Sequence, residues 1–386
     1  MWPNDQTCTS SNGGSSLTSD LYPDAASQHS LPTPPAHLLN THHQCVATLN
    51  GQNSYTSSLF LTRNFLYTGS SDRVIHIWKC SSQNYLSEHE NVNTVVAGKG
   101  AIKALIVSSD KLISAHQDHK IRVWKIDRID KITQIATLPT LSDRALRVLV
   151  PKSHIQIRRH KTCTWVHHID TVSALALSSD GSLIYSVSWD RTLKIWRTID
   201  FQCLQSVTNA HDDAINAIAL SKNGHVYTGS SDRKIKVWKQ NPGEKSHSLV
   251  GTLDKHRSGI NALALSADGA VLYSGGSNGS ILVWRDVGSG DMEVVGALRG
   301  HTSSILCLTV VSELVCSGSA DSTVRIWRRV GISYSCLSVL EGHKGPVKCI
   351  DAAFDHCSSD GVQLYLLYSA SLDCDIKVWK IFLPAY

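Results

Sequence analysis

Residues 228–238 read TGSSDRKIKVW, and this stretch returns along the chain with small changes. In every copy an aspartate, or once an asparagine, stands six residues before a tryptophan, and a serine or threonine stands ten residues before it. The seven tryptophans are Trp78, Trp124, Trp196, Trp238, Trp284, Trp327 and Trp379. A spacing kept seven times does not arise by chance and indicates seven copies of one structural unit.

Each copy predicts short strands separated by turns. In the fourth copy, INAIALS, HVYTGS and IKVWK are expected to be strands, with KNG and SDR as the turns between them. Ile235 and Val237 alternate with Lys236 and Trp238, which is the period of a strand. Asn-Gly and Asp-Gly pairs mark tight hairpin turns elsewhere in the copies. The sequence shows no amphipathic helix, so we expect an all-β chain.

The repeat resembles that of the WD40 family, in which ~40–45 residues form one four-stranded propeller blade. The resemblance implies an all-β fold, a seven-bladed WD40 β-propeller. The chain ends shortly after its seventh tryptophan strand, which leaves the last blade without an outer strand of its own. Residues 44–49 (QCVATL) look like the strands that precede other repeats. We therefore expect this N-terminal strand to complete the last blade, because pairing the two ends removes open sheet edges.

Two segments fall outside the repeat. Residues 1–42 are rich in Ser, Thr, Pro, Asn and Gly and predict a disordered tail, whereas 43–386 form the propeller. An insertion at about 127–161 separates Trp124 from Trp196 by 72 residues, against 42–52 elsewhere. Its second half carries Arg144, Arg147, Lys152, Arg158, Arg159 and Lys161 and no acid, and its VLV and HIQI segments are candidates for an extra hairpin. A solvated decoration and a functional loop both remain open for it.

Composition narrows the class of protein. The formal charge of +5 is mild, so nucleic acid is not the expected partner. No apolar run approaches the ~18 residues that span a bilayer, and no signal peptide is visible. These features predict a soluble, intracellular protein. The eleven cysteines form no C-x-x-C pair, so reduced structural thiols are expected, with no metal and no cofactor.

Four copies combine a histidine, a hydroxyl, an aspartate and a tryptophan in a way that imitates a hydrolase triad. The sets are His168/Ser186/Asp190/Trp196, His211/Thr228/Asp232/Trp238, His301/Ser317/Asp321/Trp327 and His343/Ser369/Asp373/Trp379. A catalytic triad occurs once per site, with an exposed nucleophile. Four equivalent copies instead match the structural tetrad implied by the resemblance, so no catalytic residue is predicted.

Three copies depart from the tetrad. The fifth has Asn278 in place of aspartate beside its His256, the second has Gly98 where the histidine belongs, and the first has no clear histidine near Asn53. We expect the first two blades to be held more loosely by hydrogen bonds and more by packing.

The resemblance places partner binding on the turns beside the tetrad aspartate and at the entry of the innermost strands. Trp189 stands just before that aspartate and has no evident folding reason to occupy a solvent-facing turn. The other partner-binding candidates are Arg73, Arg191, Arg233, Lys103, Lys348 and Leu372. Exposed Trp and Arg are enriched at binding hot spots. Packing of Trp189 onto the neighbouring insertion is the alternative.

The expected function is a non-enzymatic scaffold that binds other proteins and takes no small-molecule substrate. The insertion, with ATLPTL at 136–141 and IQIRRHK at 155–161, is similar to that of plant WD40 proteins of the JINGUBANG type. That similarity implies a regulatory role in the cytoplasm and nucleus, in plant signalling or development, with a link to pollen germination. A ubiquitin-ligase substrate receptor is the alternative. Lys or Arg follows every repeat tryptophan, however, where the family's cullin-ligase docking box needs W-D-x-R.

Overall fold

The computed structural model describes residues 41–49, 54–80, 91–108, 110–129, 131–148, 154–158, 161–241, 243–244, 246–288, 292–330, 333–355 and 362–384. The predicted tail lies outside these residues apart from its last two positions. Within the described part of the chain, no helix is long and apolar enough to cross a lipid bilayer.

Seven antiparallel sheets of four strands contain most of the described residues. The first blade contains β2 (Thr56–Leu61), β3 (Phe65–Ser70), β4 (Val74–Lys79) and β5 (Asn91–Val96). The second contains β6 (Ile102–Ser108), β7 (Lys111–His116), β8 (Ile121–Arg128) and β9 (Lys131–Leu138). The third contains β12 (Val172–Leu177), β13 (Leu183–Ser188), β14 (Leu193–Arg197) and β15 (Cys203–Val207). The fourth contains β16 (Ile215–Leu220), β17 (His225–Ser230), β18 (Ile235–Gln240) and β19 (His247–Leu253).

The remaining blades follow the same order, with the ends of the chain meeting in the last. The fifth blade contains β20 (Ile260–Leu265), β21 (Val271–Gly276), β22 (Ile281–Asp286) and β23 (Met292–Leu298). The sixth contains β24 (Ile305–Val311), β25 (Leu314–Ser319), β26 (Val324–Val330) and β27 (Ser333–Leu340). The seventh contains β28 (Val347–Asp355), β29 (Val362–Ser371), β30 (Ile376–Pro384) and β1 (His42–Leu49).

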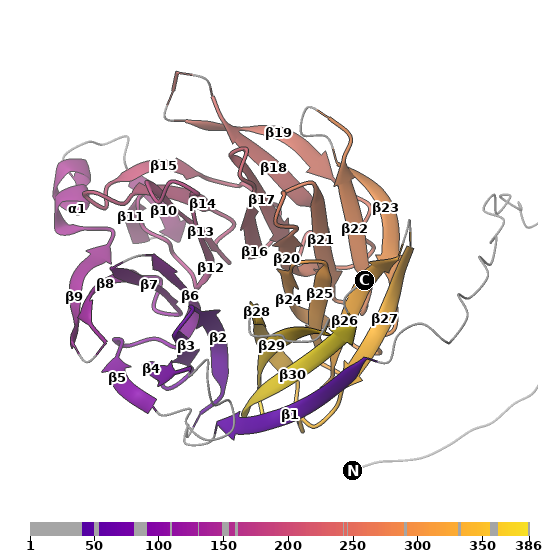
Figure 1. The fold of residues 1–386 in the computed structure, drawn as a ribbon. Helices are drawn as coiled ribbons and strands as arrows, with labels where there is room; N and C mark the ends of the chain where they lie inside the picture. Colours follow the sequence, from indigo (N-terminus) through magenta and orange to yellow (C-terminus); the bar gives the residue numbers. More distant parts are fainter. Residues whose placement is uncertain are drawn as a thin grey trace, which may run out of the picture. The chain divides into compact units, whose positions relative to one another are not determined.

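The sheets stand around a common axis, as Figure 1 shows. The first strand of each blade contacts the first strand of the next, and β28 contacts β2, so the ring is closed. The sequence-based prediction of an all-β, seven-bladed propeller is confirmed.

Strand β1 completes the seventh blade. It pairs antiparallel with β30, from His42 opposite Phe382 to Leu49 opposite Ile376. The Thr41 hydroxyl adds a hydrogen bond of 2.8 Å to the carbonyl of Leu337 in the sixth blade. The predicted closure by the N-terminal strand is thus confirmed.

Hydrophobic cores lie between neighbouring blades. One cluster joins Val187 and Ile195 of the third blade to Trp238 of the fourth. Another joins Ile326 of the sixth blade to Trp379 and Leu367 of the seventh. Each blade therefore buries its apolar faces against its neighbours, which is why the unit must repeat to be stable.

The insertion contains a helix, so the expectation of a chain without any amphipathic helix is wrong at this point. Helix α1 (Leu141–Val148) begins after Thr140, whose hydroxyl accepts a hydrogen bond of 3.2 Å from the backbone N–H of Asp143. The Asp143 carboxylate accepts one of 3.2 Å from the backbone N–H of Cys203, which ties the helix to the third blade.

A hairpin follows the helix, formed by β10 (His154–Arg158) and β11 (Lys161–Thr164). The HIQI segment forms part of it, as expected. In the VLV segment, Val148 ends α1 and the next two residues lie outside the described ones. The side chains of the basic stretch Arg144–Lys161 also lie outside the description.

Candidate functional site

A tryptophan–hydroxyl hydrogen bond is present inside every blade. The indole N–H of each repeat tryptophan donates to the serine or threonine ten residues before it, at 2.7–3.2 Å. These hydroxyls are fully buried. Burial with a partner avoids the cost of about 1–3 kcal/mol that an unpaired buried polar group would carry.

In the fourth blade this bond is part of a network of four side chains. The hydroxyl of Thr228 lies 2.8 Å from Nε2 of His211, and Nδ1 of His211 lies 2.8 Å from Oδ2 of Asp232. Because the ionised carboxylate accepts only, Nδ1–H is the donor and Nε2 accepts from the hydroxyl.

The three other predicted sets are brought together with the same contacts. They comprise His168, Ser186, Asp190 and Trp196; His301, Ser317, Asp321 and Trp327; and His343, Ser369, Asp373 and Trp379.

The protonation of the network explains its stability. Burial lowers the pKa of His211 below its ordinary value, although Asp232 acts in the opposite direction. Burial by itself would raise the pKa of Asp232, but the backbone N–H of Lys234 and the imidazole of His211 bring it below its usual range. A neutral imidazole therefore donates to an ionised carboxylate. The bond polarity is that of a hydrolase triad, but the hydroxyl is sealed inside the blade and cannot meet a substrate.

The fifth blade lacks the carboxylate. His256 still contacts the Ser274 hydroxyl at 2.6 Å, whereas the Asn278 amide oxygen accepts from the Ser280 hydroxyl at 2.8 Å. Burial lowers the pKa of His256 to about 4, with no acid acting against it.

The second blade has a substitute network, so the expectation that hydrogen bonds hold it more loosely is wrong. His116, on the same strand as Ser114, contacts the Ser114 hydroxyl at 2.8 Å and the Gly100 carbonyl at 3.1 Å. The Arg122 guanidinium donates two bonds to Asp118, at 3.1 and 2.5 Å. It lies against Gly98, where an added Cβ would collide with it. The arginine thus fills the space of the missing histidine.

The first blade retains fewer of these contacts. Trp78 donates to Thr68, and the Asp72 carboxylate accepts from the Ser70 hydroxyl and from the backbone N–H of Val74. Asn53, near which no histidine was found, lies outside the described residues.

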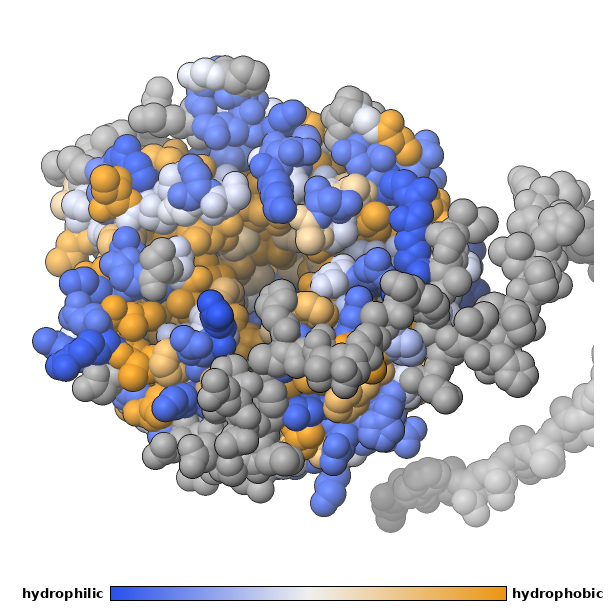
Figure 2. All heavy atoms as spheres, in the orientation of Figure 1, coloured by the Kyte–Doolittle hydropathy of each residue, from blue (hydrophilic) through white to orange (hydrophobic). Residues whose placement is uncertain are grey.

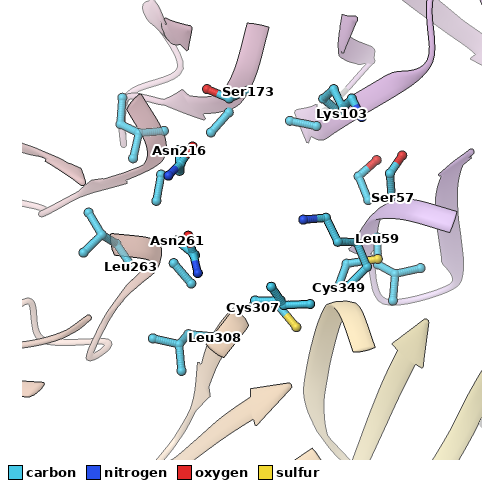
Figure 3. Close-up of a pocket in the computed structure, with 18 of the residues that line it drawn as sticks. Ser57, Leu59, Lys103, Ser173, Asn216, Asn261, Leu263, Cys307, Leu308 and Cys349 are labelled. Carbon is cyan, nitrogen blue, oxygen red and sulfur yellow. The ribbon is translucent and has the colours of Figure 1, made fainter. Parts of the chain in front are cut away.

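A central channel of about 940 Å³ runs between the innermost strands of all seven blades. Figure 2 shows the hollow at the centre of the ring, with hydrophobic residues along its wall. Each innermost strand carries a β-bulge at its second residue, where the pairing register shifts. The bulged residues line one level of the channel and are Ser57, Lys103, Ser173, Asn216, Asn261, Leu306 and Lys348. Several of their side chains surround a common opening (Figure 3).

Four of these bulged residues tie one blade to the next. The Asn216 and Asn261 amides each donate a bond of 2.9 Å, to the carbonyls of Ile260 and Ile305. The Ser57 and Ser173 hydroxyls donate to equivalent carbonyls of the following blades. Sequence reasoning missed these ties, although the repeated I-N-A at 215–217 and 260–262 was a visible signal.

Lys103 and Lys348 occupy the same level without making such a tie. Within the described residues, neither ammonium group has an ion pair or hydrogen bond. Burial lowers the pKa of Lys103, and the positive charge of Lys348 lowers it further. The residues that line the channel include no aspartate or glutamate. We call these two lysines the lysine pair. Their charges make the electrostatic potential in the channel positive, because no acid in the lining neutralises them.

Trp189 lies at the same opening and is 42% exposed. The Lys103 ammonium lies 6.0 Å from the centroid of its ring, within the range of a cation–π contact. Leu372, from the equivalent turn of the seventh blade, also lines the opening and is 43% exposed. Among the predicted partner-binding residues, the structure brings together Trp189, Lys103, Lys348 and Leu372.

The three arginines are placed differently. Arg73, Arg191 and Arg233 are exposed in the turns after the aspartate, with φ of 76°, 67° and 71°. None of them is among the residues that line the channel.

The cysteines that the structure describes are free thiols, and burial raises the pKa of Cys307 to about 12. Within the described ranges, no three His, Cys, Asp or Glu side chains cluster in a way that could hold a metal ion.

Comparison with known families gives one match. The model of the WD domain, G-beta repeat family matches residues 43–79, 160–197, 201–239, 247–285, 292–328 and 334–380. The blade with the substitute network falls between the first two matches.

Individual relatives are distant. The ribosome biogenesis protein YTM1 of Kluyveromyces lactis is 23% identical over 284 residues, which cover 69% of this chain and 54% of the relative. Its namesake from Eremothecium gossypii is 22% identical over 46% of this chain and 42% of the relative. The pre-mRNA-splicing factor cwf17 of Schizosaccharomyces pombe is 26% identical over 50% and 46%. The chain thus spans about half the length of these relatives.

Proposed function

Because the chain belongs to the WD40 family of WD-domain, G-beta repeat proteins, we propose that it is a non-enzymatic scaffold that binds partner proteins at the channel opening beside Trp189. The fold favours this class of function, since propellers present surfaces more often than they catalyse. The buried hydroxyls of the tetrads offer no nucleophile to a substrate.

The exposure of Trp189 is the observation that carries the proposal. Trp189 is a large aromatic residue that is left 42% exposed at a concave opening. Covering such a residue with a partner stabilises the complex. Leu372 adds apolar surface at the same opening, and the contact with Lys103 orients a cation beside the ring. The three turn arginines would then act at the periphery, where charge affects the rate of association more than affinity.

The kind of partner follows from two resemblances. The insertion resembles that of plant JINGUBANG-type proteins, which supports a regulatory scaffold of cytoplasm and nucleus in plant signalling, pollen germination included. The relatives are named for ribosome biogenesis and pre-mRNA splicing, which supports a second candidate, a subunit of an RNA-processing assembly. A ubiquitin-ligase receptor is the third, disfavoured because Lys or Arg replaces the aspartate of W-D-x-R seven times.

Affinity purification followed by direct binding measurement tests the proposal. Partners captured by the full chain would be identified, purified and titrated against Trp189→Ala. We expect binding to weaken by about 2 kcal/mol or more, because a hot-spot tryptophan has been truncated. The melting temperature should change little, since the ring is half exposed. Ile199→Ala is the matched control, because Ile199 is 84% exposed and lies away from the opening.

Each other outcome has a defined meaning. Equal affinity of wild-type chain and Trp189→Ala for every partner would contradict a binding site at this opening. A cullin adaptor among the abundant partners would favour the ubiquitin-ligase alternative. Processing factors of pre-rRNA or pre-mRNA would favour the second candidate.

A further inference from the structure

Neither lysine of the pair makes the hydrogen bond that ties neighbouring blades at the other bulge positions. At the same bulge position, serine and asparagine side chains tie neighbouring blades by bonds to the next backbone carbonyl. In the sixth and seventh blades, the cysteines after the bulge contact the next carbonyl instead, Cys307 at 3.6 Å and Cys349 at 3.8 Å. Lys348 is therefore not needed for a tie, and Lys103 leaves the junction of the second and third blades without one.

Two partly buried cations near each other cost free energy unless an anion lies between them. Desolvation opposes the charged form of Lys103, and the repulsion from Lys348 adds to it. Asp351, farther along β28, does not compensate. It is partly buried, does not line the channel, and accepts bonds of 2.8 and 2.9 Å from the backbone N–H groups of Leu61 and Ala352.

We propose that the lysine pair binds an acidic side chain, a carboxylate or a phosphate, on an extended segment of a partner protein. This inference rests on the proposed function and names the chemistry of its partner. Leucines such as Leu59, Leu263 and Leu308 also line the channel. A volume of about 940 Å³ admits side chains of such a segment. Trp189 and Leu372 cover an apolar residue next to the acid.

A peptide is favoured over nucleic acid by the number of charges. Affinity for nucleic acids depends on neutralising several phosphates at once. The channel lining contains two cations, and the rest of it is apolar or neutral. Two cations suit one or two anionic groups, which accept charge-assisted hydrogen bonds from the ammonium groups.

An oriented peptide library tests the proposal with the full chain. One fixed position would carry glutamate, phosphoserine, glutamine or lysine, and the peptides selected would be titrated by fluorescence polarisation. We expect glutamate or phosphoserine to be selected over glutamine, and lysine to be excluded. Lys103→Met/Lys348→Met should weaken the selected peptide about tenfold or more, since each charge-assisted bond exceeds the free energy of one decade in Kd.

The matched control removes the same net charge elsewhere. Lys79 and Lys239 are exposed, and each lies at or next to the last residue of its strand, at the opposite edge of the blade from the aspartate turns. Lys79→Met/Lys239→Met should bind the selected peptide like the wild-type chain. Equal loss in both double variants would show a bulk charge effect and overturn the proposal.

Three further results would overturn it. They are the selection of peptides without an acid, the selection of no peptide at all, and tighter lysine-dependent binding of a uridine oligonucleotide than of any peptide. Trp189→Ala separates this inference from the proposed function. If neutral peptides are selected and Trp189→Ala abolishes their binding, the opening is a partner site and only its acidic preference is wrong.

Discussion

At the residue scale, one arrangement of hydrogen bonds serves two opposite purposes in proteins. The order tryptophan, hydroxyl, imidazole, carboxylate in the fourth blade gives Thr228 and His211 the bond polarity of a nucleophile and its base. The difference from a catalytic site is that no substrate can reach the Thr228 hydroxyl. The hydroxyl is fully buried and already accepts a bond from the indole, so its only task is to satisfy its neighbours. The recognition of a catalytic residue therefore requires exposure as well as geometry.

The carboxylate of the tetrad is a sensitive point of that network. Asp232→Ala should destabilise the fold by about 1–3 kcal/mol, because it removes the acceptor of the His211 imidazole and of two backbone N–H groups. Asn278→Ala should cost less, since Asn278 is exposed and accepts only from Ser280. Urea denaturation of both variants measures the difference. Equal losses would show that the carboxylate adds nothing to the tetrad.

At the scale of the element, the second blade shows how a repeat tolerates the loss of a defining residue. Gly98 leaves a space, and the bidentate pair of Arg122 and Asp118 fills it. The hydroxyl of Ser114 keeps an imidazole partner because His116 supplies one from the same strand. The blade thus replaces one network by two smaller ones, and it keeps the turn at Asp118.

Arg122→Met should destabilise the second blade by about 1–3 kcal/mol, because Asp118 loses two charge-assisted bonds in a mostly buried site. Arg197→Met is the matched control. In the wild-type chain, Arg197 also donates two bonds to one carboxylate, that of Asp200, but both side chains are about one-third exposed. An exposed pair contributes at most about 1 kcal/mol. The melting temperatures of the two variants test this prediction. A larger decrease for Arg197→Met than for Arg122→Met would contradict the assigned role of Arg122.

The parts of the fold and of the candidate site that could be predicted are those with a local sequence pattern that repeats along the chain. The strands, the ring and the position of Trp189 follow from a spacing that occurs seven times. Helix α1 was missed because it occurs once and is short, although Thr140 three residues before Asp143 is a helix-start signal. The contact of Arg122 with Gly98 was not predictable, because packing brings together residues 24 positions apart that no repeat pattern links.

At the scale of the whole molecule, stability depends on the closure of the ring of blades. Each blade is stabilised mainly by its neighbours, so one unclosed junction affects the cores on both sides. The seventh blade differs from the others because both ends of the chain contribute strands to it. Strand β1 pairs with Ile376–Phe382 of β30, and Leu49 is buried in the core shared with the first blade.

Truncation at the N-terminus tests that dependence. Deleting residues 1–40 leaves β1 intact, so we expect a melting temperature close to that of the full chain. Deleting residues 1–50 also removes β1, which exposes the backbone edge of β30 and part of the core around Leu49. That protein should melt at a lower temperature and aggregate with rising concentration, because an open edge strand pairs with other chains. Calorimetry and light scattering on both truncations provide the comparison, and identical melting of the two would mean that the seventh blade is stable with three strands.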